Sequence, residues 1–72
     1  MADMIEALRP KVIRDAIRLA GGGAHLAEYL GIERQAVYQW TRVPVEHVLR
    51  IENLTGIPCY RMRPDIYPRP RP

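Results

Sequence analysis

The chain has 72 residues, of which 47% are hydrophobic and 26% charged, and its formal net charge is +3. This length allows one domain, and since only about 60% of the unfolded surface is buried at this size, we expect oligomerisation to add stability. No run of about 18 apolar residues occurs, so the sequence predicts no membrane span, and the acidic start MADMIEALRPK argues against a signal peptide. The single Cys59 excludes an intrachain disulfide and fits a reducing cytoplasm.

The charge is unevenly distributed along the chain. Residues 1–56 hold seven basic and seven acidic residues, whereas residues 57–72 hold four arginines and one aspartate. Because the helical part has no net charge, it can bind an anionic partner such as DNA only if a few of its cations lie at the contact. The basic tail would add non-specific electrostatic attraction to phosphates. This balance disfavours an architectural DNA binder without sequence preference.

Apolar spacing predicts a first helix that ends near Ala20 and buries Ile13, Ala16 and Ile17. Pro10 suits its first turn, and a separate short turn built on Met4, Ile5 and Leu8 precedes it. The glycines at 21–23 end this helix. They lack the Lys and Ser/Thr that follow in a nucleotide-binding loop, so we interpret them as a turn.

Residues 26–40 have the pattern of two short helices joined by a tight turn. The first helix buries Leu26, Ala27 and Leu30. The second runs from Glu33 to Trp40 and buries Ala36, Val37 and Trp40, with Ile32 in the corner. Gly31 stands at the turn, where a left-handed backbone costs glycine little.

The opposite side of the second helix is polar. At about 100° per residue, Arg34, Gln35, Tyr38 and Gln39 gather within an arc of roughly 140°. Arginine pairs in bidentate fashion with guanine and glutamine with adenine. The sequence therefore predicts a face suited to base edges in duplex DNA.

After Trp40, Pro44 opens a further helix that ends at Gly56. We expect it to carry five apolar side chains inward: Val45, Val48, Leu49, Ile51 and Leu54. Residues 57–62 suit an extended strand, and the proline-rich end suits a mobile polyproline-like tail. The predicted organisation is a DNA-binding domain over 1–56 and an extended Arg/Pro-rich segment over 57–72.

Enzymatic chemistry finds no support in these residues. His25 and His47 have neither a metal-ligand spacing to Cys59 nor a carboxylate pair arranged for catalysis. We therefore expect no catalytic residues, no metal and no cofactor. Tyr29 and Tyr60 are interpreted as packing residues.

Residues 23–40 resemble the helix-turn-helix of the Cro/CI repressor superfamily, with matching marks at Ala27, Gly31, Ile32, Val37 and Trp40. Over nearly the whole chain, including VPVEHVLRIENLTG and MRPDIYP, the sequence is similar to small Cro-like or YdaS-like prophage regulators. The resemblance implies an all-α, compact helical bundle of the lambda repressor-like fold. Glu33 departs from the Ser or Thr usual in such proteins. It either accepts a hydrogen bond from cytosine N4 or serves as a first-turn carboxylate.

The resulting hypothesis is a transcriptional regulator in a bacterial cytoplasm, associated with the nucleoid. Arg34, Gln35 and Gln39 contact bases, and Tyr38 reaches a thymine methyl or the backbone. Phosphates are held by the amides of Gly23 and Ala24 and by His25, Thr41 and Arg42.

A homodimer on an inverted repeat, with half-sites roughly 34 Å apart, is expected because one helix reads few base pairs. The residues of segment 57–67 either form the dimer surface or fold back onto their own core: Ile57, Tyr60, Met62, Ile66 and Tyr67. The resemblance also leaves open an antitoxin-like role, in which the chain binds a toxin partner and autoregulates its operon.

Overall fold

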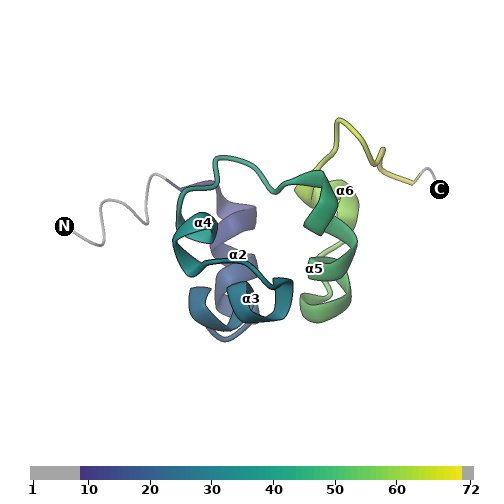
Figure 1. Ribbon diagram of the computed structural model, residues 1–72. Coiled ribbons are helices and arrows are strands. Elements are labelled where there is room, and N and C mark those ends of the chain that lie inside the picture. The colour runs from purple at the N-terminus through teal and green to yellow at the C-terminus, as the bar shows by residue number, and fades with distance from the viewer. Residues whose placement is uncertain (1–8, 71–72) are drawn as a thin grey trace.

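The computed structural model describes residues 9–70 of the chain, which contain five α-helices and one short 3₁₀ helix (Figure 1). They are α2 (Lys11–Leu19), α3 (Gly23–Leu30), α4 (Arg34–Tyr38), η1 (Val45–His47), α5 (Val48–Thr55) and α6 (Cys59–Met62). No strand occurs within residues 9–70, so the all-α prediction is confirmed. The short turn expected around Met4, Ile5 and Leu8 lies outside the described residues.

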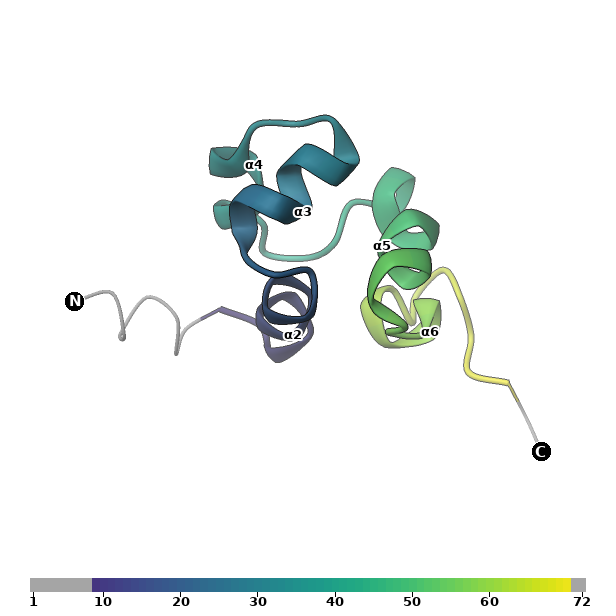
Figure 2. The same ribbon diagram turned by 90° about the horizontal axis from the view of Figure 1, so that it is seen from below.

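The helices form two groups bridged by α2. Figures 1 and 2 show α3 and α4 together on one side and α5 and α6 on the other. Helix α2 contacts α3, α5 and α6. The long connection after α4 passes from the first group to the second, and its Val43 is fully buried.

One hydrophobic core joins all of these elements. Its fully buried side chains are Ile13, Leu26, Val37, Val43, Val48 and Ile51. Burying each such side chain contributes about 1.5–3 kcal/mol. Because each group supplies some of these residues, neither group has a core of its own.

Helix α5 turns fewer apolar residues inward than its sequence predicts. Val48 and Ile51 are fully buried, but Leu49 and Leu54 of α5 remain 54% and 38% exposed, and Val45, which lies in η1, remains 46% exposed. On a helical wheel, Leu49 and Leu54 flank the Val48–Ile51 face by roughly 100° on either side. Since α2 and α6 cover one side of α5, the expectation that all five side chains point inward is wrong.

The strand expected over Ile57–Met62 is also wrong, because Cys59–Met62 form helix α6. Pro58, which has an extended backbone, precedes the helix. The Glu52 carboxylate accepts a hydrogen bond from the backbone N–H of Cys59, with 2.9 Å between the nitrogen and Oε2. A carboxylate at a helix N-terminus is stabilising. Ile57 and Met62 are each only 3% exposed and belong to the shared core.

Arg50 of α5 fastens the end of α3 to the second group. Its Nη2 donates to the carbonyl of Tyr29 at 2.8 Å and its Nη1 to that of Leu30 at 3.4 Å. The guanidinium also lies 5.3 Å from the centre of the Tyr29 ring. The last carbonyls of a helix have no partners within it and carry partial negative charge, so a cation there is favourable.

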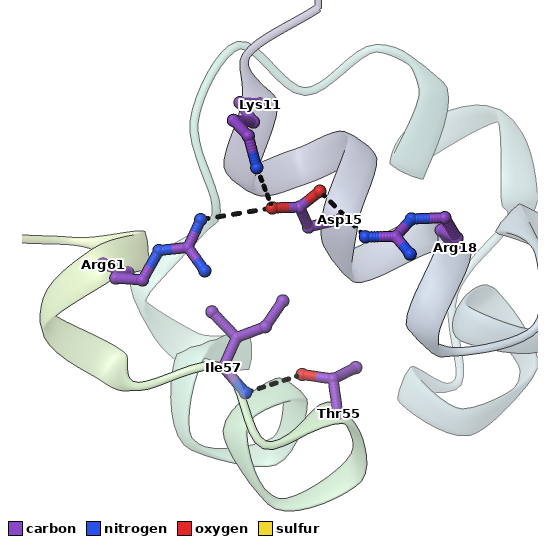
Figure 3. A network of polar contacts seen from close by, with 6 residues as sticks. All are labelled: Lys11, Asp15, Arg18, Thr55, Ile57 and Arg61. Atoms are coloured by element: carbon purple, nitrogen blue, oxygen red, sulfur yellow. Dashed lines mark hydrogen bonds and ion pairs between the residues drawn. The ribbon is translucent and has the colours of Figure 1, made fainter.

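Asp15 links α2 to α6 through three cations (Figure 3). Its carboxylate accepts hydrogen bonds from Lys11 at 2.9 Å and Arg18 at 3.3 Å, both on α2, and from Arg61 of α6 at 3.2 Å. The hydrogen bonds from Lys11 and Arg61 lower the pKa of Asp15 from 3.8 to about 2. Figure 3 also shows the nearby hydrogen bond from the Ile57 amide to the Thr55 hydroxyl, 3.2 Å long.

The lowered pKa gives the stability a definite pH dependence. The contribution of the Asp15 carboxylate is complete above its unfolded pKa of 3.8 and is lost as pH falls towards about 2. We expect Asp15→Asn to lower the free energy of unfolding at pH 7, with the difference from the wild type shrinking as pH falls from 5 to 2. Urea unfolding across this range measures it. Glu28→Gln, at an exposed carboxylate without an ion pair in residues 9–70, is the control. A difference that stays constant with pH would contradict the role of this charge.

Candidate nucleic-acid interface

The turn between α3 and α4 has the geometry that the sequence predicts. Gly31 adopts φ 72° and ψ 31°, the left-handed region that favours glycine. The Ile32 amide donates to the Ala27 carbonyl at 3.0 Å and the Gly31 amide to Glu28 at 3.2 Å. These paired bonds form a Schellman motif, which ends α3 and turns the chain into α4.

The buried side of this unit matches the predicted one, although α4 is shorter than expected. Leu26, Ala27, Leu30 and Val37 are buried, while Ile32, Ala36 and Trp40 are half-buried. The helix ends at Tyr38, so the expected extension to Trp40 is wrong. The Trp40 ring instead stacks on His47, with 6.0 Å between ring centres. This contact turns the chain away from α4 towards η1.

The structure brings together the four predicted reading residues. Arg34, Gln35, Tyr38 and Gln39 are all exposed on α4 or at its C-terminal cap. No hydrogen bond or ion pair joins the side chains of Arg34, Gln35 or Gln39 to another residue between 9 and 70. Their donors and acceptors are therefore available to an external ligand.

Tyr38 differs from the other three because it also has a structural role. Its ring lies 5.1 Å from the Arg9 guanidinium, and Arg9 Nη2 donates to the Tyr38 carbonyl at 3.5 Å. Its hydroxyl lies so close to Gly23 that a Cβ there would overlap it. Tyr38 thus ties α4 to the start of α3 while remaining 42% exposed. Arg9 is 29 positions from Tyr38 in the sequence, and no periodic pattern links the two residues, so the sequence could not predict this contact.

The predicted phosphate contacts at the start of α3 do not share one side of the helix. Gly23 is buried against Tyr38, whereas Ala24 and His25 are exposed. Two residues along a helix is a rotation of about 200°, so His25 faces away from Gly23. It lines a hollow of about 330 Å³ with Tyr29 and Leu54.

Thr41 and Arg42, the other predicted phosphate contacts, are exposed in the connection after α4. Arg42 Nη1 lies 3.7 Å from the Asp65 carboxylate. Arg63 binds the same carboxylate through Nε at 3.0 Å and Nη2 at 2.8 Å, and donates from Nη1 to the Val43 carbonyl at 3.0 Å. The Arg63 hydrogen bonds lower the pKa of Asp65 to about 2. The two arginines therefore face an ionised partner that sequence reasoning missed.

The residues predicted for dimerisation are divided by the fold. Ile57 and Met62 are buried in the chain's own core, as the fold-back alternative requires. Tyr60 and Tyr67 are half-buried, and Ile66 is 43% exposed. Arg69 lies over the Tyr60 ring at 5.8 Å. Much of the apolar surface of this segment is thus used within one copy.

Among residues 9–70, no three His, Cys, Asp or Glu side chains are grouped so as to hold a metal ion. Within the same residues, no helix has the length and apolar character needed to cross a membrane.

Comparison with known proteins matches the chain to a family. The model of a family described as bacterial toxin YdaS matches residues 13–71, from α2 through the C-terminal segment. No curated protein and no solved structure matches the chain.

The contact between Gly23 and Tyr38 yields a prediction. Gly23 does not have a positive φ, and glycine to alanine at such a site normally stabilises a protein by about 0.4–1 kcal/mol. Here the added Cβ overlaps Tyr38, so we expect Gly23→Ala to destabilise the chain by about 1–3 kcal/mol, as overpacking does. Urea unfolding measures the change. In a Tyr38→Ala background the same substitution is expected to be neutral or stabilising. An equal loss in both backgrounds would refute the steric explanation.

Proposed function

The chain belongs to the bacterial toxin YdaS family, and we propose that it is a sequence-specific regulator of transcription that inserts α4 into the major groove of duplex DNA. The observation that carries the proposal is the exposed set Arg34, Gln35, Tyr38 and Gln39, held outward by the Gly31 turn and by burial of Val37. A groove about 12 Å wide admits a helix of this kind.

The side chains on α4 have the chemistry needed to distinguish bases. Arg34 presents a planar fork of donors that fits O6 and N7 of guanine. Gln35 and Gln39 each carry a donor and an acceptor that fit N6 and N7 of adenine. Tyr38 is held at its ring by Arg9 and Gly23, so it is suited to a thymine methyl or the sugar–phosphate backbone at the edge of the contact.

Phosphate contacts on both sides of α4 would set its orientation in the groove. The amides at the start of α3, at Gly23 and Ala24, supply one set, and Thr41 and Arg42 supply the other. His25 faces away from Gly23, into the hollow with Tyr29 and Leu54, and is left out of this set. Arg42 faces Asp65 at 3.7 Å across an exposed pair. Exposed ion pairs contribute little, so a DNA phosphate can replace Asp65 as its partner.

One short helix contacts few base pairs, and we therefore propose a homodimer on an inverted repeat with half-sites roughly 34 Å apart. The repressor role, the cytoplasmic location and the association with the nucleoid are parts of this proposal. No cofactor or metal is needed for it.

A second candidate function comes from the family description, which names a toxin. In this function the chain slows growth by binding a protein. The antitoxin-like role, in which the chain restrains a toxin partner and autoregulates its operon, belongs to the same class, because it too depends on a protein partner.

The DNA-reading proposal is tested by substitutions on α4. We expect Arg34→Ala and Gln35→Ala each to cost about 1–3 kcal/mol on a site selected from random duplexes, and to relax the preference at one base pair. Fluorescence anisotropy with the selected and a scrambled duplex measures both effects. Arg14→Ala, at an exposed arginine of α2, removes one positive charge and is expected to weaken binding to both duplexes equally. Equal losses on both duplexes for Arg34→Ala would contradict base reading.

The two functions are separated by growth after overproduction. We expect the wild type to slow growth by occupying chromosomal sites, and the double variant Arg34→Ala/Gln35→Ala to restore it, because both side chains are exposed and their loss leaves the core intact. Colony counts after induction, at equal protein levels, give the result. Inhibition that persists in the double variant would assign the effect to a protein partner.

A further inference from the structure

A carboxylate from the C-terminal segment lies beside one of the residues proposed to hold a DNA phosphate. Asp65 Oδ2 is 3.7 Å from Nη1 of Arg42. Both side chains are exposed, so the pair lies on the surface that a duplex bound by Arg42 would face. A phosphate that approaches this guanidinium therefore also approaches Asp65.

Arg63 holds Asp65 in this position. Its Nε donates to Oδ1 of Asp65 at 3.0 Å and its Nη2 to Oδ2 at 2.8 Å, while its Nη1 donates to the carbonyl of the fully buried Val43 at 3.0 Å. The Arg63 side chain is only 13% exposed. The backbone from 63 to 67 forms a tight turn, in which the Tyr67 amide donates to the Arg63 carbonyl at 2.8 Å. The carboxylate is thus fixed from its inner side, independently of its exposed neighbour.

The Asp65 carboxylate is charged at neutral pH, because the hydrogen bonds from Arg63 lower its pKa from 3.8 to about 2. A carboxylate offers a guanidinium the same kind of acceptor oxygens as a phosphate does. The two groups also have charges of the same sign, so they repel each other at the same arginine. Asp65 therefore occupies Arg42 in the free protein and opposes the phosphate that would replace it.

This opposition affects matched and unmatched DNA sequences differently. On a matched sequence, the base contacts of α4 hold the nearby phosphates close to Arg42, where one of them can displace Asp65. On an unmatched sequence the base contacts are missing, and binding depends on phosphates alone. A like charge fixed at the contact therefore weakens unmatched complexes more, and such repulsion is one of the two general sources of specificity.

We propose that the Asp65 carboxylate competes with DNA phosphates for Arg42 and thereby restrains binding to sequences that α4 does not match. Asp65 is then a specificity-determining residue, although it donates no hydrogen bond to DNA, and Arg63 is the residue that positions it. The proposal rests on the function proposed above, since it requires a duplex at Arg42.

Removal of the carboxylate charge tests the competition. Asp65→Asn keeps an oxygen that Arg63 can bond. We expect it to raise the affinity for a scrambled duplex about fivefold at low salt, and the affinity for the selected duplex by a smaller factor. Because one more cation becomes available to phosphates, the slope of log K against log salt steepens by about 0.9, and the gain shrinks roughly 3.5-fold between about 50 and 200 mM salt. Fluorescence anisotropy with both duplexes over this salt range measures these effects.

Two further variants show whether Asp65 acts locally and through Arg42. Glu28→Gln removes the same charge at an exposed carboxylate of α3, beside the hollow that Leu54 lines, and is expected to leave both affinities unchanged. In an Arg42→Ala background, Asp65→Asn is expected to give little gain, because the contested cation is gone. Circular dichroism checks the fold of each variant. Asp65→Ser, which keeps an acceptor oxygen in the turn, provides the same test should Asp65→Asn unfold.

An unchanged or weaker affinity of Asp65→Asn for the scrambled duplex would overturn the proposal, as would an equal gain from Glu28→Gln or in the Arg42→Ala background. If the wild type prefers the selected duplex and Asp65→Asn changes nothing, the proposed function stands and the competition fails. If the wild type prefers no duplex but Asp65→Asn gains affinity as expected, the competition stands and base reading by α4 fails. Failure of every variant to bind any duplex would overturn both.

Discussion

The left-handed backbone at Gly31 is the constraint on which the rest of the structure depends. It ends α3 and starts α4 at an angle that lets Leu26, Leu30 and Val37 enter one core. Because Val37 points inward, the residues on the other side of α4 must point outward. A side chain with a Cβ at Gly31 would strain this turn, and the exposed polar face would lose its fixed direction.

Three arginines hold this unit in place by donating to backbone carbonyls. Arg50 bonds Tyr29 and Leu30 at the end of α3, Arg63 bonds Val43 after α4, and Arg9 bonds Tyr38 within α4. Each contact joins segments at least 20 positions apart. These three guanidinium groups bind carbonyls of the protein itself, and Lys11, Arg18 and Arg61 pair with Asp15, so fewer cations remain for an anionic ligand. The proposed DNA contact therefore depends on the placement of Arg34 and Arg42 more than on total charge.

Helices α4 and α5 lie at opposite ends of the helical body and differ in the chemistry of their exposed side chains. The α4 end presents the side chains of Arg34, Gln35 and Gln39, which no residue between 9 and 70 engages, as recognition of base edges needs. The outer side of α5 instead exposes Leu49 and Leu54, because α2 and α6 cover only one side of this helix. Helix α2 contacts α3 and α5, so the two ends belong to one rigid core.

The helices with strong local signals could be predicted from the residue pattern alone. Apolar spacing located α2, α3 and the Gly31 turn, and the same spacing separated the buried Val37 from the exposed Arg34, Gln35 and Gln39. Tertiary structure decided the rest. Helix α6 in place of a strand depends on the Glu52 carboxylate seven positions away, and the outward Leu49 and Leu54 depend on which sides of α5 have neighbours. The contacts of Arg9, Arg50 and Arg63 join distant segments. Periodicity reports the environment of one helix at a time, whereas these features arise from contacts between helices, which have no period in the sequence.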